Sequence, residues 1–108
     1  MITRNGYSGF GYWEGMPYGI CTDKFEDFKQ FKNFIPKEKI IEHIKSLDPA
    51  LCPMPQHYDI FTGEVITTAG QYEDGHFLFP LDFLRYYEKY DIGIQPEYEE
   101  YLKSIGIE

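Results

Sequence analysis

Hydrophobic residues recur at helical spacing in two segments that each begin at a proline. In PKEKIIEHIKSL, residues 36–47, isoleucine and leucine fall at positions i, i+1, i+4 and i+7, with charged side chains on the other face. That stripe predicts an amphipathic helix, and proline suits its first position. PEYEEYLKSIG, residues 96–106, places tyrosine, leucine and isoleucine at i, i+3, i+4 and i+7. It predicts a final helix with acids in its first turn and Gly106 as its cap.

A third, shorter helix is predicted from the spacing of phenylalanines. Phe25, Phe28 and Phe31 lie at i, i+3 and i+6, on one side of a helix. Asp23 stands three residues before Glu26, which is the spacing of a capping box with Asp in place of Ser or Thr. We therefore expect this helix to begin just after Asp23.

The aromatic-rich segment 80–90, PLDFLRYYEKY, predicts a fourth helix. Its leucines and one tyrosine follow a 3–4 spacing while other rings continue around the side, so the apolar face is wide. Most of these side chains are therefore expected in the core. Tyrosine can bury its ring and keep its hydroxyl in water. Some of Tyr86, Tyr87 and Tyr90 are expected to reach the surface, because they point in different directions.

Short β-rich stretches alternate with turns from residue 58 to residue 79. Turn sequences at Thr62-Gly63 and Asp74-Gly75 separate three stretches rich in β-branched and aromatic residues. This pattern predicts an antiparallel three-stranded meander. Residues 6–20 alternate glycine with aromatic residues, which favours short strands or an ordered loop over a helix.

Length and composition indicate one folded domain over residues 1–108. The chain is 43% hydrophobic and 26% charged, and its length suffices for one core. We predict an α+β fold, in which a small antiparallel sheet of three or slightly more strands carries about four short helices mainly on one face. No apolar run approaches the ~20 residues that span a bilayer, and no secretion signal is visible. We therefore expect a cytoplasmic protein without membrane contact, with Cys21 and Cys52 reduced.

The net charge of −8 is concentrated in the C-terminal part. Residues 24–45 carry six lysines against four acids, whereas residues 46–108 carry twelve acids against three basic residues. A negative field repels phosphate backbones, so nucleic acid is excluded as a predicted partner, and a basic protein is favoured. The acids near the predicted turns are interpreted as turn formers and solvated ends rather than as a catalytic pair. They are Asp59, Glu64, Glu73 and Asp74.

The best indication of a function is the combination of ten tyrosines and one tryptophan with this acidity. Aromatic anchors carry much of the energy of protein interfaces, although such rings also fill small cores. We predict a non-enzymatic protein-interaction module, with an immunity-type inhibitor of a basic protein as one form of it. No catalytic residue, cofactor or metal is predicted, and the oligomeric state is left open. The predicted partner-binding residues are Tyr86, Tyr90, Asp91, Glu97, Tyr98 and Glu100.

Two other functions stay open at this point. Cys52, His57 and His76 would serve a small metal- or thiol-dependent enzyme if the fold brought them together. The sequence has no C-x-x-C or H-x-x-x-H pair, which argues against a structural zinc site. The third possibility is an aromatic pocket around Tyr12 and Trp13 that holds a flat small molecule.

About half of the chain carries a recognisable combination of motifs. It has the Asp74-Gly75 turn, two phenylalanines before Pro80, a Leu-x-Tyr-Tyr helix from Leu84, and a segment from Tyr90 to Glu97 with alternating aliphatic residues. This combination resembles the C-terminal element of small, uncharacterised bacterial proteins, with Phe79 where tryptophan is expected. The resemblance implies no established activity, so no catalytic residue is carried over. Some small acidic bacterial proteins neutralise toxins encoded beside them, which is an analogy of size and charge alone.

Overall fold

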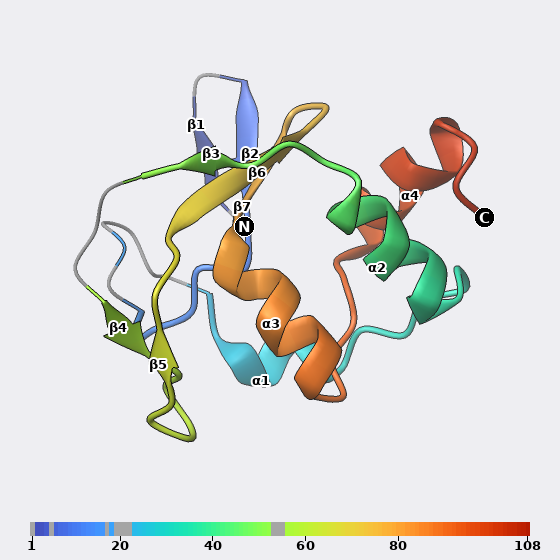
Figure 1. Cartoon of the computed structure of the whole chain (residues 1–108). Coiled ribbons are helices and arrows are strands. Elements are labelled where there is room, and N and C mark those ends of the chain that lie inside the picture. The colour runs from blue at the N-terminus through green and yellow to red at the C-terminus, as the bar shows by residue number, and fades with distance from the viewer. Residues whose placement is uncertain (1, 5, 17, 19–22, 53–55) are drawn as a thin grey trace.

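A mixed five-stranded sheet, a separate two-stranded hairpin and four helices make up the described part of the chain in a computed structural model (Figure 1). The structure describes all residues except 1, 5, 17, 19–22 and 53–55, and residues 2–4 by their backbone alone. The strands are β1 (Ile2–Arg4), β2 (Tyr7–Gly9), β3 (Ala50–Leu51), β4 (His57–Tyr58), β5 (Val65–Ile66), β6 (Gly70–Asp74) and β7 (Phe77–Pro80). The helices are α1 (Phe25–Phe28), α2 (Lys37–Lys45), α3 (Leu81–Lys89) and α4 (Pro96–Ser104). None of the helices formed by the described residues is long and apolar enough to cross a lipid bilayer.

The five-stranded sheet has the order β1-β2-β7-β6-β3 and is not purely antiparallel. β2 runs parallel to β7, with Ser8 paired to Phe77, whereas the other neighbouring strands are antiparallel. The α+β class is confirmed, but the predicted antiparallel direction of the sheet is wrong. The reason is that the N-terminal segment supplies two strands, and β2 occupies the edge of β7 that the meander would have left free.

The predicted meander is divided between the two sheets. The turn at Asp74-Gly75 joins β6 to β7 as predicted, and Gly75 has the positive φ of +63° that this turn requires. The turn at Thr62-Gly63 joins β4 to β5 in the separate hairpin. β5 does not pair with β6, because β3 and β7 already occupy both edges of β6.

The predicted helices are present, and the shortest of them differs most from its prediction. α2, α3 and α4 lie within the segments 36–47, 80–90 and 96–106. The helix expected after Asp23 is only four residues long in the structure. It is α1, and its N-cap is Lys24. The predicted capping box is wrong, because Asp23 turns away from the helix and its Oδ2 accepts the Gly11 N–H at 2.8 Å.

The core lies on one face of the five-stranded sheet. Buried and exposed residues alternate along β6, with Tyr72 and Asp74 on the buried side. Tyr72 pairs with Phe79 and Asp74 with Phe77, so the buried side chains of β7 share that face. α3 follows β7 directly and packs against both strands.

Aromatic rings fill this core. Trp13 contacts Phe25, Phe28 and Tyr86 edge-on, with ring centroids 5.2, 4.8 and 5.7 Å apart. Such edge-to-face pairs are favourable beyond the area that they bury. The largest fully buried aromatic side chains are Phe10, Trp13, Phe77, Phe79, Phe83, Tyr86, Tyr87 and Tyr98. The aromatic run from 75 to 90 is therefore mostly core, as predicted, and of its three tyrosines Tyr90 alone is partly exposed.

Buried carboxylates connect the helices to this core. Asp74, at the end of β6, accepts a hydrogen bond from the Tyr98 hydroxyl at 2.6 Å, and its Oδ2 lies 2.8 Å from His43 Nε2. It thus joins α4 and α2 to the β6–β7 turn. Glu99 of α4 accepts the backbone N–H groups of Phe34 and Ile35 at 2.6 and 3.0 Å. Part of the chain's acidity is therefore structural, since a buried carboxylate needs such partners.

Candidate functional site

The β4–β5 hairpin combines a buried face with an exposed apolar one. His57 pairs with Ile66 across the hairpin, and both side chains are buried. Tyr58 pairs with Val65, and these side chains are 52% and 49% exposed. Side chains alternate across a strand, so the two pairs point to opposite faces. The hairpin therefore presents the apolar pair Tyr58–Val65 to solvent, and the neighbouring pair His57–Ile66 on its other face is buried.

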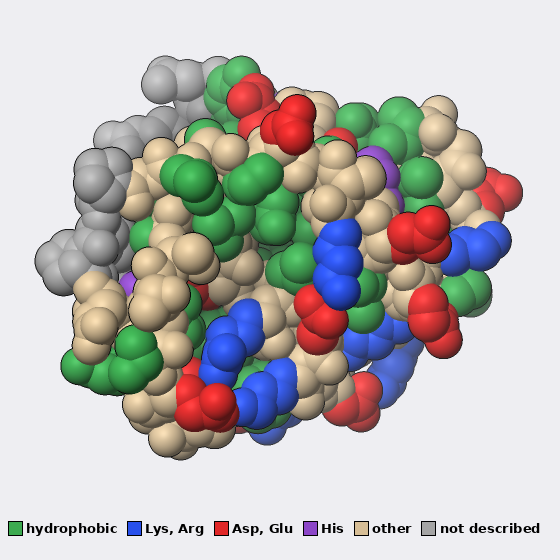
Figure 2. All heavy atoms as spheres, in the orientation of Figure 1, with side chains coloured by type: hydrophobic (Ala, Val, Ile, Leu, Met, Phe, Trp, Pro, Cys, Tyr) green, Lys and Arg blue, Asp and Glu red, His purple; other side chains and the backbone are tan. Residues whose placement is uncertain are grey.

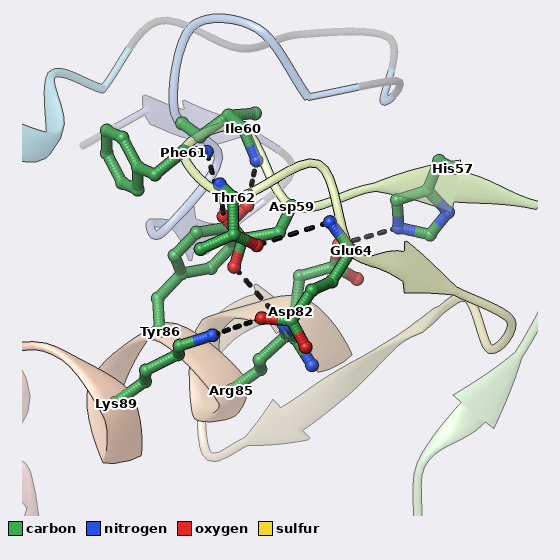
Figure 3. Close-up of polar contacts among 10 residues, drawn as sticks. All are labelled: His57, Asp59, Ile60, Phe61, Thr62, Glu64, Asp82, Arg85, Tyr86 and Lys89. Atoms are coloured by element: carbon green, nitrogen blue, oxygen red, sulfur yellow. Dashed lines mark hydrogen bonds and ion pairs between the residues drawn. The ribbon is translucent and has the colours of Figure 1, made fainter.

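The backbone of this hairpin is fixed by the carboxylate of Asp59 (Figure 3). Asp59 Oδ1 accepts the backbone N–H groups of Phe61 and Thr62 at 2.8 and 3.0 Å, and Arg85 Nε of α3 donates to Oδ2 at 3.3 Å. The side chain is fully buried. Burial by itself would raise the pKa of Asp59, but the two N–H groups and Arg85 outweigh it and lower the pKa below its ordinary value.

Two further contacts hold the hairpin against α3. The Ile60 N–H donates to the Tyr86 hydroxyl at 2.9 Å, and burial raises the pKa of Tyr86 to about 12. Glu64 accepts from Lys89 Nζ at 2.5 Å and lies 3.5 Å from an Arg85 terminal nitrogen. These partners lower the pKa of the exposed Glu64 carboxyl. Figure 3 shows Arg85, Tyr86 and Lys89 of α3 on the side of the helix that faces the hairpin turn.

A buried chain of hydrogen bonds fixes the start of β4. His57 Nε2 lies 2.6 Å from Asp82 Oδ2, and the Tyr18 hydroxyl donates to Asp82 Oδ1 at 2.8 Å. Burial, followed by the bond to Asp82, raises the pKa of Tyr18 well above its ordinary value. His57 Nδ1 has no hydrogen-bond partner among the described residues. The arrangement holds β4 on the first turn of α3, and the imidazole is 7% exposed.

Phe61 adds a third exposed apolar side chain at the turn. Its ring is 51% exposed, and its inner part packs on Phe25 and Tyr90 with centroids 4.7 and 5.2 Å apart. We refer to Tyr58, Phe61 and Val65 together as the hairpin patch. Figure 2 shows hydrophobic side chains over the β4–β5 hairpin at the lower left, with charged side chains beside them on the α3 side.

The predicted partner-binding residues do not form one surface. Tyr86 and Tyr98 are fully buried, which corrects the expectation that they are exposed anchors. Tyr86 is enclosed because it points toward Trp13 and the hairpin, and Tyr98 because it reaches Asp74. Tyr90 is partly buried and its hydroxyl oxygen is inaccessible. The three predicted acids, Asp91, Glu97 and Glu100, are exposed as expected.

The residues of the alternative enzyme do not converge. Cys52 is an exposed free thiol, His57 is buried against Asp82, and Cys21 lies outside the described residues. His76 is in the β6–β7 turn, which Figure 1 places at the opposite end of the molecule from β4. The described residues also contain no group of three or more His, Cys, Asp or Glu side chains that could hold a metal ion.

The predicted pocket around Tyr12 and Trp13 is found only in part. Trp13 is fully buried in the core and is not among the residues that line the cavity beside Tyr12. Tyr12 lines a cavity of about 370 Å³ together with Tyr18, Leu51, Cys52 and neighbouring residues. The indole therefore serves packing, and the phenol ring alone is available to a ligand.

The hairpin patch could be anticipated only in outline from the sequence. The Thr62-Gly63 turn and the role of Asp59 as a turn former were predicted, and both are confirmed by the bonds at the turn. The expectation that Asp59 has a solvated end is wrong, because Arg85 and the hairpin enclose it. A carboxylate four residues before a turn glycine, with an arginine on a nearby helix, is the pattern that could have indicated the anchor.

No family model, curated protein or solved structure matches this chain. The resemblance of its C-terminal half to small bacterial proteins therefore stays a prediction, and the function is argued below from the residues alone.

Proposed function

We propose that this chain is a non-enzymatic protein-interaction module that contacts its partner through the hairpin patch of Tyr58, Phe61 and Val65. The observation that carries the proposal is the cross-strand pair Tyr58–Val65, half exposed on a backbone that Asp59 and Tyr86 hold in place. Exposed apolar side chains are typical of interface cores, where aromatic residues act as anchors. A backbone that is already ordered reduces the entropy lost on binding.

A basic partner suits the charge of the chain. The net charge is −8, and Asp91, Glu97 and Glu100 are exposed. Opposite charge accelerates encounter, whereas buried apolar contacts slow release. In this proposal the acids predicted from the sequence contribute to the long-range field, and the hairpin patch contributes the contact. An immunity-type inhibitor of a basic effector is one form that such a module takes.

The proposal is tested by a double substitution on the exposed face of the hairpin. Tyr58→Ser with Val65→Ser removes both apolar side chains and leaves the Asp59 and Tyr86 anchors intact. The partner is first isolated with the wild-type chain from its host, and its dissociation constant is then measured for each variant. We expect the double variant to bind at least about tenfold more weakly, as for interface anchors.

A matched control separates contact from general hydrophobicity. Leu51 and Ile105 are exposed apolar residues outside the hairpin, at 70% and 46% exposure. Leu51→Ser with Ile105→Ser should leave the affinity unchanged. Equal weakening by both double variants, or wild-type affinity of the hairpin variant, would contradict the proposed surface. Circular dichroism confirms that each variant is folded.

The basic nature of the partner has its own test. Replacing Glu97 and Glu100 by Gln should lower the association rate constant and weaken its dependence on salt, with little change in the dissociation rate. Surface plasmon resonance at two ionic strengths measures both rates. An association rate that is independent of salt for the wild-type chain would exclude attraction to a basic partner. The contact through the hairpin patch would then still be tested by the double substitution of Tyr58 and Val65.

A further inference from the structure

A second site is formed by residues that the hairpin patch does not use. A pocket of about 280 Å³ lies between residues 29–37, which comprise the connection from α1 to α2 and the first residue of α2, and residues 91–93 of the connection from α3 to α4. Phe31, Ile35 and Ile92 give it apolar walls, and Tyr87 of α3 also lines it. Mixed apolar walls with a few polar groups are typical of sites for small molecules.

The Tyr87 hydroxyl is the polar group that this pocket leaves without a partner. The residue is 1% exposed, and its hydroxyl makes no hydrogen bond to any of the described residues. Its oxygen is not among the buried polar atoms that are closed to solvent, so a molecule that enters the pocket can reach it. Burial raises the pKa of Tyr87, so the phenol stays protonated and can donate a hydrogen bond. The side chain is therefore prepared for an acceptor that the chain itself does not supply.

The pocket is positively charged on an otherwise acidic molecule. Lys29, Lys32 and Lys37 line it together with the carboxylate of Asp91. Lys29 is paired with Glu26 at 3.1 Å, so Lys32 and Lys37 supply the positive charge of the pocket. Lys37 Nζ lies 4.5 Å from the centroid of the Tyr87 ring and donates to the Tyr90 carbonyl at 2.9 Å. Lys32 is exposed and has no ion pair among the described residues. A protonated hydroxyl and lysines together favour a ligand with a negative charge.

An exposed ring lies at the rim of the same pocket. Phe34 is 86% exposed, the most of any large hydrophobic side chain that the structure describes. Lys103 Nζ lies 5.0 Å from its ring centroid, which leaves the rest of the ring open to solvent. Aromatic faces stack favourably on other rings. Phe34 thus offers a surface for a flat apolar group next to the lysines.

We infer that this pocket binds a small organic anion, a carboxylate or phosphate monoester that carries an aromatic ring. The ring lies against Phe34 and the apolar walls. The anionic group accepts a hydrogen bond from the Tyr87 hydroxyl and faces Lys32 and Lys37. The inference shares no residue with the hairpin patch, so it stands or falls independently of the proposed protein interaction.

The test is a titration of the isotopically labelled chain, followed by NMR at constant ionic strength. The probes are phenyl phosphate, phenylacetate and the uncharged phenylacetamide. We expect saturable shifts for residues 29–37 and 91–93 with at least one of the two anions, and much weaker binding of the amide. Whichever anion binds more tightly identifies phosphate or carboxylate as the preferred group.

Three variants locate the binding groups. Tyr87→Phe keeps the ring and removes the hydroxyl, and it should weaken the anion by about tenfold or more, because hydrogen bonds to charged groups are strong. Lys32→Ala should weaken it by about two- to fivefold, as for an exposed charge pair. Lys45→Ala is the matched control, since Lys45 pairs with Glu88 outside the pocket. It should leave the affinity unchanged.

Several results would overturn the inference. One is the lack of a saturable response to either anion at millimolar concentration. Another is equal binding of the amide, which would show that charge plays no part. Wild-type affinity of Tyr87→Phe would remove the hydroxyl from the site. Equal weakening by Lys45→Ala and Lys32→Ala would reduce the effect to general attraction between opposite charges.

Discussion

The aromatic residues of helices α3 and α4 and those of the β4–β5 hairpin meet opposite environments. Tyr86 and Tyr98 are fully buried, whereas Tyr58 and Phe61 are 52% and 51% exposed. The helical rings are covered by elements from elsewhere in the chain, such as the segment that contains Trp13. The hairpin forms a separate two-stranded sheet and is held mainly by its contacts with α3. Exposure therefore depends on how many elements surround a ring rather than on the type of residue.

Buried carboxylates stabilise both regions, but they connect different numbers of elements. Asp74 contacts His43 of α2 and both Tyr98 and Tyr101 of α4. Asp59 binds its own turn and Arg85 of α3. The loss of Asp74 should therefore affect the whole molecule, whereas a change at Asp59 should affect the hairpin.

The largest expected effect is that of Asp74→Ala. The substitution removes the acceptor of the buried Tyr98 hydroxyl and the partner of the partly exposed His43 ring, and leaving such polar groups unpaired costs about 1–3 kcal/mol each. The free energy of unfolding is measured by urea denaturation. Glu73→Ala is the control, because Glu73 precedes Asp74 in β6 and is exposed. It should change stability by no more than about 0.5 kcal/mol. Similar losses for both would mean that Asp74 is not a structural connection.

An intermediate effect is expected for Tyr86→Phe, which connects the two regions. The substitution keeps the ring in the core and removes the hydroxyl that accepts the Ile60 N–H, at a cost of about 1–2 kcal/mol. Hydrogen exchange at the Ile60 amide should accelerate, since the hairpin loses an anchor. Native-state exchange followed by NMR measures it.

The matched control for that experiment is Tyr90→Phe. The Tyr90 hydroxyl is buried and has no hydrogen-bond partner among the described residues. Its removal should be neutral or slightly stabilising, because a buried polar group without a partner is unfavourable. If Tyr90→Phe destabilised the chain as much as Tyr86→Phe, the bond to Ile60 would not explain the result.

Local sequence patterns account for the helices better than for the sheet. α2 and α4 follow from apolar residues at helical spacing after Pro36 and Pro96, which is information within the segment itself. The partner of β7 could not be predicted in this way, because β2 lies some seventy positions earlier, with Ser8 opposite Phe77. Pairing between distant segments depends on the whole chain, and only the tendency of residues 6–20 to form short strands was visible.

The same limit applies to the candidate site. The turn at Thr62-Gly63 and the function of Asp59 as a turn former are local properties, and they could be predicted. The enclosure of Asp59 depends on Arg85, and that of Tyr86 on Trp13. A helical pattern shows that a ring lies on the side of a helix, but it does not show what covers that side. The exposure of Asp91, Glu97 and Glu100 could be predicted more easily, because charged side chains usually remain in water.

The smallest expected effect concerns the pH dependence of the hairpin anchor. The pKa of Asp59 is lower in the folded chain than in the unfolded chain, so the unfolded state binds more protons as the pH falls. Its contribution to stability is complete above the ordinary carboxyl pKa of about 4 and is lost as the pH falls through the lower pKa of the folded state.

Asp59→Asn isolates that contribution. Asparagine can still accept the Phe61 and Thr62 N–H groups, so the substitution mainly removes the charge that faces Arg85. We expect a loss of about 1 kcal/mol or less at neutral pH, because Arg85 is partly exposed. The difference from the wild-type chain should shrink as the pH falls below about 4. Glu97→Gln changes the charge equally at an exposed residue and should show no such convergence. Urea denaturation across this pH range decides the matter: a constant difference between Asp59→Asn and wild type would show that the charge of Asp59 does not stabilise the hairpin, and that its two backbone hydrogen bonds suffice.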